Sequence, residues 1–218
     1  MISLLTQPPS LPSSSMSFLK TRKGFITDAA FGKSDSMLCF STECISTRAY
    51  GIAFSLPLLY KYGGVHHLRK PMATVSSRSI LQDRATPGSI KIEKEDKGPA
   101  IAALFTQYGI GAPFECNQIA QSQVMRSQDR AYVEGLKRDT GRHRLRYFEE
   151  CLERISGEVG NEIKKIYFPS SIGCRGIVDG FWREKYLPLL ERLAEEQGKK
   201  NREVILISLH DDEERKTR

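Results

Sequence analysis

Between residues 145 and 209 the sequence alternates twice between the pattern of an amphipathic helix and that of a buried strand. The first helix is predicted by apolar residues at spacings of three and four: Leu145, Phe148, Leu152, Ile155 and Val159. A strand, "IKKIYFP", then precedes a second helix, "LPLLERLAEEQG", which has a proline in its first turn and a glycine at its end. The segment "REVILISL" reads as a last buried strand. Such an alternation predicts helices layered on a sheet, the α/β class.

Three further strands are predicted upstream. The run "SMLCFS" (36–41) has the length of a strand, "GSIKIEKE" (88–95) alternates apolar and charged residues, and "AIAALFTQ" (100–107) is continuously apolar, as central strands are. A Gly-Pro pair between the last two predicts a hairpin-like turn. Residues 108–141 are polar and irregular, and we interpret them as a long surface loop or insertion.

The chain of 218 residues is long enough for one α/β domain with a full core. We expect this domain over residues 23–209. Residues 1–22 are rich in serine and proline and lack acidic side chains, which predicts a disordered tail and leaves a transit peptide as the alternative. Residues 210–218 form a charged tail.

Composition limits the classes of site. The five cysteines show no regular spacing to one another or to the four histidines, so we expect neither a disulfide framework nor a metal site. This favours a reducing compartment, the cytoplasm or the nucleus, with organelle import through the tail left open. No apolar run reaches the length of a membrane span. The formal charge of +7 is spread along the chain, which favours a small anionic ligand over nucleic acid.

Several segments follow one another along the chain: "YGIAFSLPLLYKYGGVHHL", "PGSIKIEKED", "AIAALFTQYGIG", "RYFEECLERI", "KIYFPSSIGC" and "FWREKYLPLLERLAEE". Their order, and roughly their spacing, resemble those of macro domains. Over residues 24–209 the chain resembles the yeast-type ADP-ribose 1''-phosphate phosphatases and the related ADP-ribosyl-carboxylate hydrolases. The resemblance implies a three-layer α/β/α fold with a mixed central sheet, and a site for ADP-ribose at the strand ends.

The resemblance also implies which residues bind the ligand. Asp28 stands near the family's adenine-binding aspartate, with an ordinary turn aspartate as the alternative. A first loop, around the distal ribose and pyrophosphate, corresponds to Arg48, Ala49, Tyr50, Gly51 and Ile52. A second phosphate loop corresponds to Ser171, Ile172, Gly173, Cys174, Arg175 and Gly176. Glycines after a strand let backbone amides approach a phosphate closely.

Two further side chains belong to the predicted site. Phe181 is a candidate for stacking on a ribose or adenine, or else extends the core. Asp179 is the carboxylate within the second loop and the candidate catalytic residue, where it would hold the attacking water. The alternative for Asp179 is a helix N-cap, a position at which aspartate is among the preferred residues.

Three functions remain open. The chain hydrolyses the distal phosphate or an ADP-ribosyl ester of ADP-ribose, or it binds ADP-ribose without turnover, or, on net charge alone, it binds nucleic acid. The second alternative is favoured by departures from the family: Leu38-Cys39-Phe40 replaces a small residue and histidine, and Gln107 replaces a lysine. Cys39 and Cys174 follow apolar runs and are interpreted as packing residues instead of nucleophiles. We expect no cofactor and a monomer.

Overall fold

A computed structural model describes residues 18–28, 30–44, 85–94, 97–109, 111–170 and 179–208. Their strands are β1 (Leu19–Lys23), β2 (Ser36–Glu43), β3 (Ile90–Lys94), β4 (Ala100–Gln107), β5 (Lys165–Pro169) and β6 (Glu203–Ser208). They form one six-stranded sheet in the order β1-β6-β5-β2-β4-β3. Neighbours pair in parallel except β3, which is antiparallel to β4, so the sheet is mixed.

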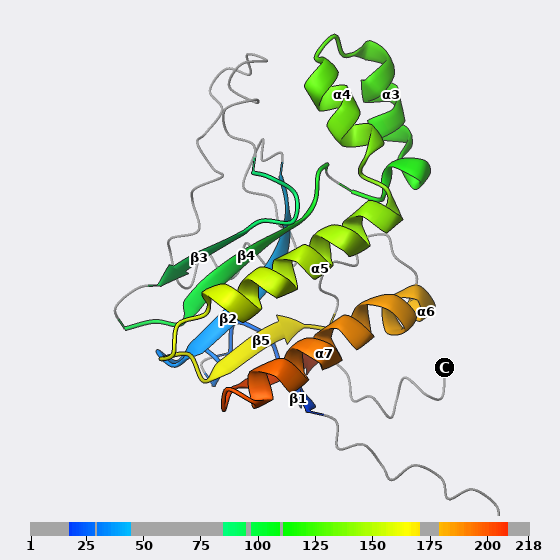
Figure 1. Ribbon diagram of the computed structural model, residues 1–218. Coiled ribbons are helices and arrows are strands. Elements are labelled where there is room, and N and C mark those ends of the chain that lie inside the picture. Colours follow the sequence, from blue (N-terminus) through cyan, green and yellow to red (C-terminus); the bar gives the residue numbers. More distant parts are fainter. Residues whose placement is uncertain are drawn as a thin grey trace, which may run out of the picture.

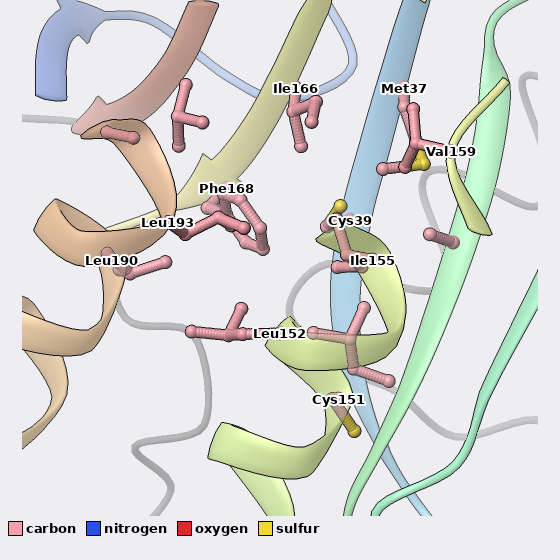
Figure 2. Packing of buried hydrophobic residues seen from close by; sticks show 14 of the residues in the cluster. Met37, Cys39, Cys151, Leu152, Ile155, Val159, Ile166, Phe168, Leu190 and Leu193 are labelled. Carbon is pink, nitrogen blue, oxygen red and sulfur yellow. The ribbon is translucent and has the colours of Figure 1, made fainter. Parts of the chain in front are cut away.

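Two helices cover one face of this sheet (Figure 1). The helix α5 (Gly141–Glu158) lies against β4, and α7 (Leu187–Gly198) lies against β6 and packs on α5. Figure 2 shows Leu152 and Ile155 of α5 and Leu190 and Leu193 of α7 among the strand residues of this layer. Leu152 and Ile155 are among the apolar positions that the periodicity predicted, and both predicted helices are confirmed with boundaries within a few residues.

The opposite face of the sheet is equally apolar. Leu38, Tyr167 and Ile205 are buried there, together with Ile26 and Phe31 from the turn that follows β1. The rings of Phe31 and Tyr167 lie 5.0 Å apart between centroids. A sheet buried on both faces needs a covering layer on each side. The predicted α/β class, with a mixed central sheet and a three-layer arrangement, is confirmed.

The predicted tail is too long, because β1 lies inside it. Residues 19–22 belong to the sheet, where β1 pairs in parallel with β6 from Leu19↔Val204 to Lys23↔Ser208. Four of the five side chains of this edge strand are exposed. Since an edge strand needs only backbone pairing on one side, its sequence "LKTRK" carries no apolar pattern that would reveal it.

The interpretation of residues 108–141 as a loop is wrong for most of its length. The segment contains η1 (Phe114–Cys116), a single 3-10 turn, and the helices α3 (Gln118–Arg126) and α4 (Arg130–Lys137). Side-chain oxygens cap the two helices: Asn117 accepts from Ala120 N at 3.0 Å, and Asp129 from Tyr132 N at 3.0 Å. The capping residues were visible in the sequence, but helices this short bury too few apolar side chains to show a period. We call α3 and α4 the α3–α4 hairpin.

Among the described residues, no helix has the length and apolarity needed to cross a bilayer.

Candidate functional site

The carboxyl ends of β1, β6, β5, β2 and β4 lie at one edge of the sheet, since these strands are mutually parallel. At this edge the connections that follow β5 and β2 run in opposite directions along the sheet. After β5 it continues through α7 to β6, on the side away from β2, and after β2 it continues to β3 and β4, on the side away from β5. Open α/β sheets bind ligands outside the strand ends at such a switch point.

The pairing of β2 with β5 is short. It runs only from Ser36↔Lys165 to Leu38↔Tyr167, although β2 continues to Glu43 and β5 to Pro169. Beyond this point β2 pairs with β4 as far as Glu43↔Gln107, and β5 pairs with β6 as far as Pro169↔Ile207. The last residues of both strands therefore belong to two separate halves of the sheet. The sheet parts at its carboxyl edge, at the switch point.

A helix begins at this edge after β5. The elements α6 (Asp179–Phe181), η2 (Trp182–Tyr186) and α7 follow one another without interruption, and η2 is a turn of π-helix. The π-turn is marked by the bond from Leu187 N to Trp182 O, five residues back. Turns of this kind occur frequently at functional sites.

The π-turn separates two kinds of side chain. Trp182 and Tyr186 are buried, and the Tyr186 ring lies 5.1 Å from that of Phe148 between centroids. Phe181 is 37% exposed and reaches Tyr186 only edge-on, at 6.3 Å between centroids. Trp182 and Tyr186 thus fill the part of the core that lies beneath this turn. Phe181 remains at the surface beside the helix start, where a stacking role would require it.

Asp28 caps a turn after β1. Its Oδ2 accepts a hydrogen bond from Phe25 N at 2.9 Å, and Phe25 O accepts one from Asp28 N at 2.8 Å. Gly24 makes this turn possible, since its φ is +147° and a Cβ there would lie 2.7 Å from Asp28 Oδ2. Phe31 follows this turn and packs on the face of the sheet opposite α5 and α7, which fixes the position of the turn. Asp28 therefore lies at the same edge as Phe181, with the end of β6 between their elements, and it has a structural role of its own.

The end of β4 carries a buried polar network that the sequence did not reveal. Arg144 of α5 is 1% exposed, and its Nη2 lies 2.6 Å from Asp139 Oδ2. The Asp139 carboxylate also accepts hydrogen bonds from Tyr108 N and Gly109 N, both at 2.9 Å. Arg144 donates further to Gly111 O at 2.8 Å and to Ala112 O at 3.1 Å. Every strong donor of the network has an acceptor, as a buried ion pair requires.

Gln107 belongs to the same network. Its Nε2 donates to Gly109 O at 2.9 Å, and its Oε1 lies 3.4 Å from Arg144 Nη1. The Gln107 side chain is therefore buried and fixes the backbone after β4. Two hydroxyls on nearby strand ends, Ser41 Oγ and Thr106 Oγ1, are buried without a hydrogen-bond partner in the described structure.

The three buried cysteines of the described residues, Cys39, Cys44 and Cys151, are poor nucleophiles. Cys39 is fully buried, and burial raises the pKa of its thiol well above the usual range. Burial likewise raises the pKa of Cys44 and of Cys151, whose Sγ donates to Ser89 O at 3.3 Å. A buried neutral thiol packs as an apolar group. The packing interpretation of Cys39 agrees with this environment.

No family model matches the sequence, and no curated protein does. Among solved structures, the chain is similar to a protein of unknown function from Bacteroides thetaiotaomicron, with 20% sequence identity and a TM-score of 0.54. The alignment covers 88% of this chain and 98% of that protein. An identity this low supports the fold and carries no information about a ligand.

Most of the predicted ligand-binding residues lie outside the described residues: Arg48, Ala49, Tyr50, Gly51, Ile52, Ser171, Ile172, Gly173, Cys174, Arg175 and Gly176. The described strands nevertheless show where both segments join the sheet. Residues 45–84 follow β2 in the chain and residues 171–178 follow β5, so the two segments are attached to neighbouring strands that part at their carboxyl ends. In the described part of the chain, no group of three or more His, Cys, Asp or Glu residues has the arrangement of a metal site.

Proposed function

We propose that this protein binds ADP-ribose or a derivative at the carboxyl edge of its sheet, between β2 and β5. The observation that supports the proposal most directly is the end of the β2–β5 ladder at Leu38↔Tyr167, at the switch point of the sheet. The two glycine-bearing segments that the sequence associates with a diphosphate, 48–52 and 171–176, follow these two strands. The two segments are therefore attached to neighbouring strands, although they are far apart in the sequence.

The local architecture suits a phosphate. A strand, the glycine-bearing segment 171–176 and a helix start follow one another in the chain from β5 to α6, and the first amides of a helix lack partners inside the helix. These amides and the helix dipole favour an anion at the N-terminal end. Phe181, exposed beside that end, offers an apolar ring to the ribose or adenine of the same ligand.

Hydrolysis at the distal end of the ligand would proceed by direct attack of water. Cys39, one of the two cysteines considered as nucleophiles, is a buried neutral thiol. The remaining requirement is a carboxylate that orients the water, and Asp179 is the first residue of the helix that follows the second loop. The proposed reaction is the release of phosphate or of an ester-linked group from ADP-ribose, with Asp179 as the water-holding residue.

Calorimetric titration with ADP-ribose and AMP tests the binding. Bulk at Gly51 or Gly173 would keep backbone amides away from the diphosphate, so Gly51→Glu and Gly173→Glu should abolish ADP-ribose binding in folded protein. Gly157→Glu is the matched control, because Gly157 lies on α5 near the opposite edge and a Cβ there has no neighbour within 4 Å. Undiminished affinity in both loop variants would refute the placement.

Release of inorganic phosphate from ADP-ribose 1''-phosphate separates an enzyme from a binding module. A wild-type protein that binds ADP-ribose tightly and releases no phosphate above the buffer background is a reader of ADP-ribose. The replacement of the family's histidine and lysine by the buried side chains of Cys39 and Gln107 favours slow or narrow turnover.

A further inference from the structure

The α3–α4 hairpin carries an unusual concentration of free arginines. The hairpin and the start of α5 hold four exposed arginine side chains for which the structure shows no carboxylate within ion-pair distance: Arg126, Arg130, Arg138 and Arg142. Elsewhere in the described chain many exposed cations are paired, as Arg192 is with Glu149 at 2.9 Å and Lys20 with Glu203 at 2.5 Å, while others, such as Lys97 and Lys164, are not. Unpaired cations at one place favour an anionic partner.

A groove lies between the two helices of the hairpin. It has a volume of about 520 Å³ and is lined by Gln118, Ile119, Ser122, Gln123, Arg126, Ser127 and Tyr132. This volume is within the range of small-molecule sites. The hydroxyl of Tyr132 and Gln123 Oε1 are 3.0 Å apart in a hydrogen bond that joins the walls of the groove, which fixes both side chains before any ligand arrives.

The apolar exposure of the hairpin points to a partner as well. Ile119, which lines the groove, is 73% exposed, and Met125 on the same helix is 88% exposed. Both belong to the few large apolar side chains that the described surface leaves in water. This surface has aromatic, amide and apolar groups and the Arg126 guanidinium in one groove, with Arg130, Arg138 and Arg142 on the same segment of the chain.

We propose that the α3–α4 hairpin binds single-stranded nucleic acid, with a base in the groove and the adjacent phosphates on the arginines. A guanidinium binds a phosphate through two parallel hydrogen bonds. The guanidinium of Arg126 lines the groove and can make this contact. Glutamine and serine side chains recognise base edges, and an aromatic ring beside them accepts the face of a base. The arginines on α4 and at the start of α5 then neutralise flanking phosphates.

An acidic polypeptide fits the same surface less well. Its carboxylates would need cations along the groove, but only Arg126 among the seven lining residues is charged. The uncharged amides, hydroxyls and ring would have no matching group on a run of Glu or Asp side chains. The uncharged polar groups and the ring that line the groove therefore favour a partner that carries planar polar bases between its negative charges.

This site is separate from the proposed ADP-ribose site. Figure 1 shows the hairpin projecting beyond the end of α5, away from α6. Tyr108 anchors its base, because a Cβ on Gly135 would lie only 2.0 Å from Tyr108 Cζ. The nucleic-acid proposal therefore holds or fails independently of the proposed function.

Fluorescence anisotropy with a labelled, unstructured RNA of about twelve nucleotides tests the proposal on the full chain. We expect binding that weakens from about 50 to about 200 mM salt, and Arg126→Glu combined with Arg130→Glu should weaken it about tenfold or more at the lower salt. The matched control is Lys164→Glu, an exposed cation before β5 at the opposite edge of the sheet, which should leave affinity within about twofold. Tyr132→Ala should weaken binding with no change in the salt dependence, because it removes a base contact and no charge.

Circular dichroism and thermal unfolding of each variant confirm that the fold is intact. The proposal is overturned if wild-type protein does not bind the RNA, or if the double arginine variant binds as tightly as Lys164→Glu. It is also overturned if a poly-glutamate peptide displaces the RNA at equal charge concentration, which would identify an acidic protein surface as the partner. Displacement by saturating ADP-ribose would place the RNA at the sheet edge instead of the hairpin, and so contradict the proposal as well.

Discussion

Leu38 of β2 and Tyr167 of β5 form the last ladder pair between their strands, and both side chains are buried. Both residues face the second layer of the core, where the Tyr167 ring contacts that of Phe31. The two strands are thus locked together below this pair and separate above it. The separation of the two strands is therefore part of the fold, because the pair at which it begins is packed in the core.

Hydrogen exchange tests whether a ligand fills this edge. Backbone amides of residues 39–44 and 168–181 should exchange more slowly after ADP-ribose is added, because a bound ligand stabilises the strand ends and the helix start against opening. Mass spectrometry of peptides covering these ranges measures the change. Peptides from β3 lie at the far edge of the sheet and should show no difference. Equal protection with and without saturating ligand would contradict binding at this position.

Asp139→Asn should destabilise the fold strongly. The substitution leaves the buried Arg144 guanidinium without its counter-charge and weakens the acceptor for Tyr108 N and Gly109 N. Breaking a buried ion pair by removing one partner costs about 3–5 kcal/mol in unfolding free energy. Urea denaturation measures this loss.

Glu158→Gln is the control for that experiment. It removes the exposed pair with Arg154, whose atoms lie 3.9 Å apart, and should cost less than about 0.5 kcal/mol. Similar losses in the two variants would show that the Asp139–Arg144 network contributes no more than a surface pair.

Gly135→Ala should also destabilise the protein, although alanine is the better helix former. The new Cβ would meet the Tyr108 ring at 2.0 Å, and overpacking of this kind costs about 1–3 kcal/mol. Gly157→Ala, with open space around its Cβ, should instead stabilise by about 0.5–1 kcal/mol. Thermal unfolding compares the two variants. A stabilised Gly135→Ala would mean that Tyr108 does not pack on α4.

Asp179→Ala distinguishes the two roles considered for this residue. As the water-holding carboxylate it should lower kcat by a factor of about 10²–10⁴ and leave ADP-ribose affinity nearly unchanged. As an N-cap it should lower stability by about 1 kcal/mol, with activity following the folded fraction. Phosphate release and thermal unfolding, measured on the same preparation, decide between these patterns.

The buried and exposed thiols should differ strongly in their rate of reaction with a thiol reagent. Cys39, Cys44 and Cys151 are buried and Cys116 is exposed, so in a Cys174→Ser background only Cys116 should react rapidly with a thiol reagent at neutral pH. Denaturant should release the other three. Rapid reaction of two or more thiols in the folded variant would show that the core opens readily.

The same thiols predict an alkaline loss of stability. Burial raises the pKa of Cys39 above its ordinary value of 9.0, and the thiols of Cys44 and Cys151 shift in the same direction. The folded state therefore holds these protons more tightly than the unfolded state. The unfolding free energy should be unaffected by them below pH 9 and should fall as the pH rises above it. Urea midpoints measured across this range provide the check, and Cys39→Ala should reduce the slope.

The sequence by itself determined the elements whose burial shows in the residue types. The apolar spacing from Leu145 to Val159 identified α5, because burial of one helix face imposes a period on the residues. The runs "AIAALFTQ" and "IKKIYFP" identified β4 and β5, because strands buried on both faces are continuously apolar. The α/β class followed from the order of these elements. The residue type of Cys39 and the apolar run before it were also sufficient to indicate packing.

Only the tertiary structure decided which distant segments meet. β1 became visible through its backbone pairing with β6, the sheet parts between β2 and β5 where two ladders compete, and Arg144 is neutralised by an aspartate that precedes its own helix. Backbone hydrogen bonds are available to every residue type, and a single buried ion pair has no period. Neither therefore leaves a pattern in the sequence, and both appear only when the chain has folded and the partners lie within bonding distance.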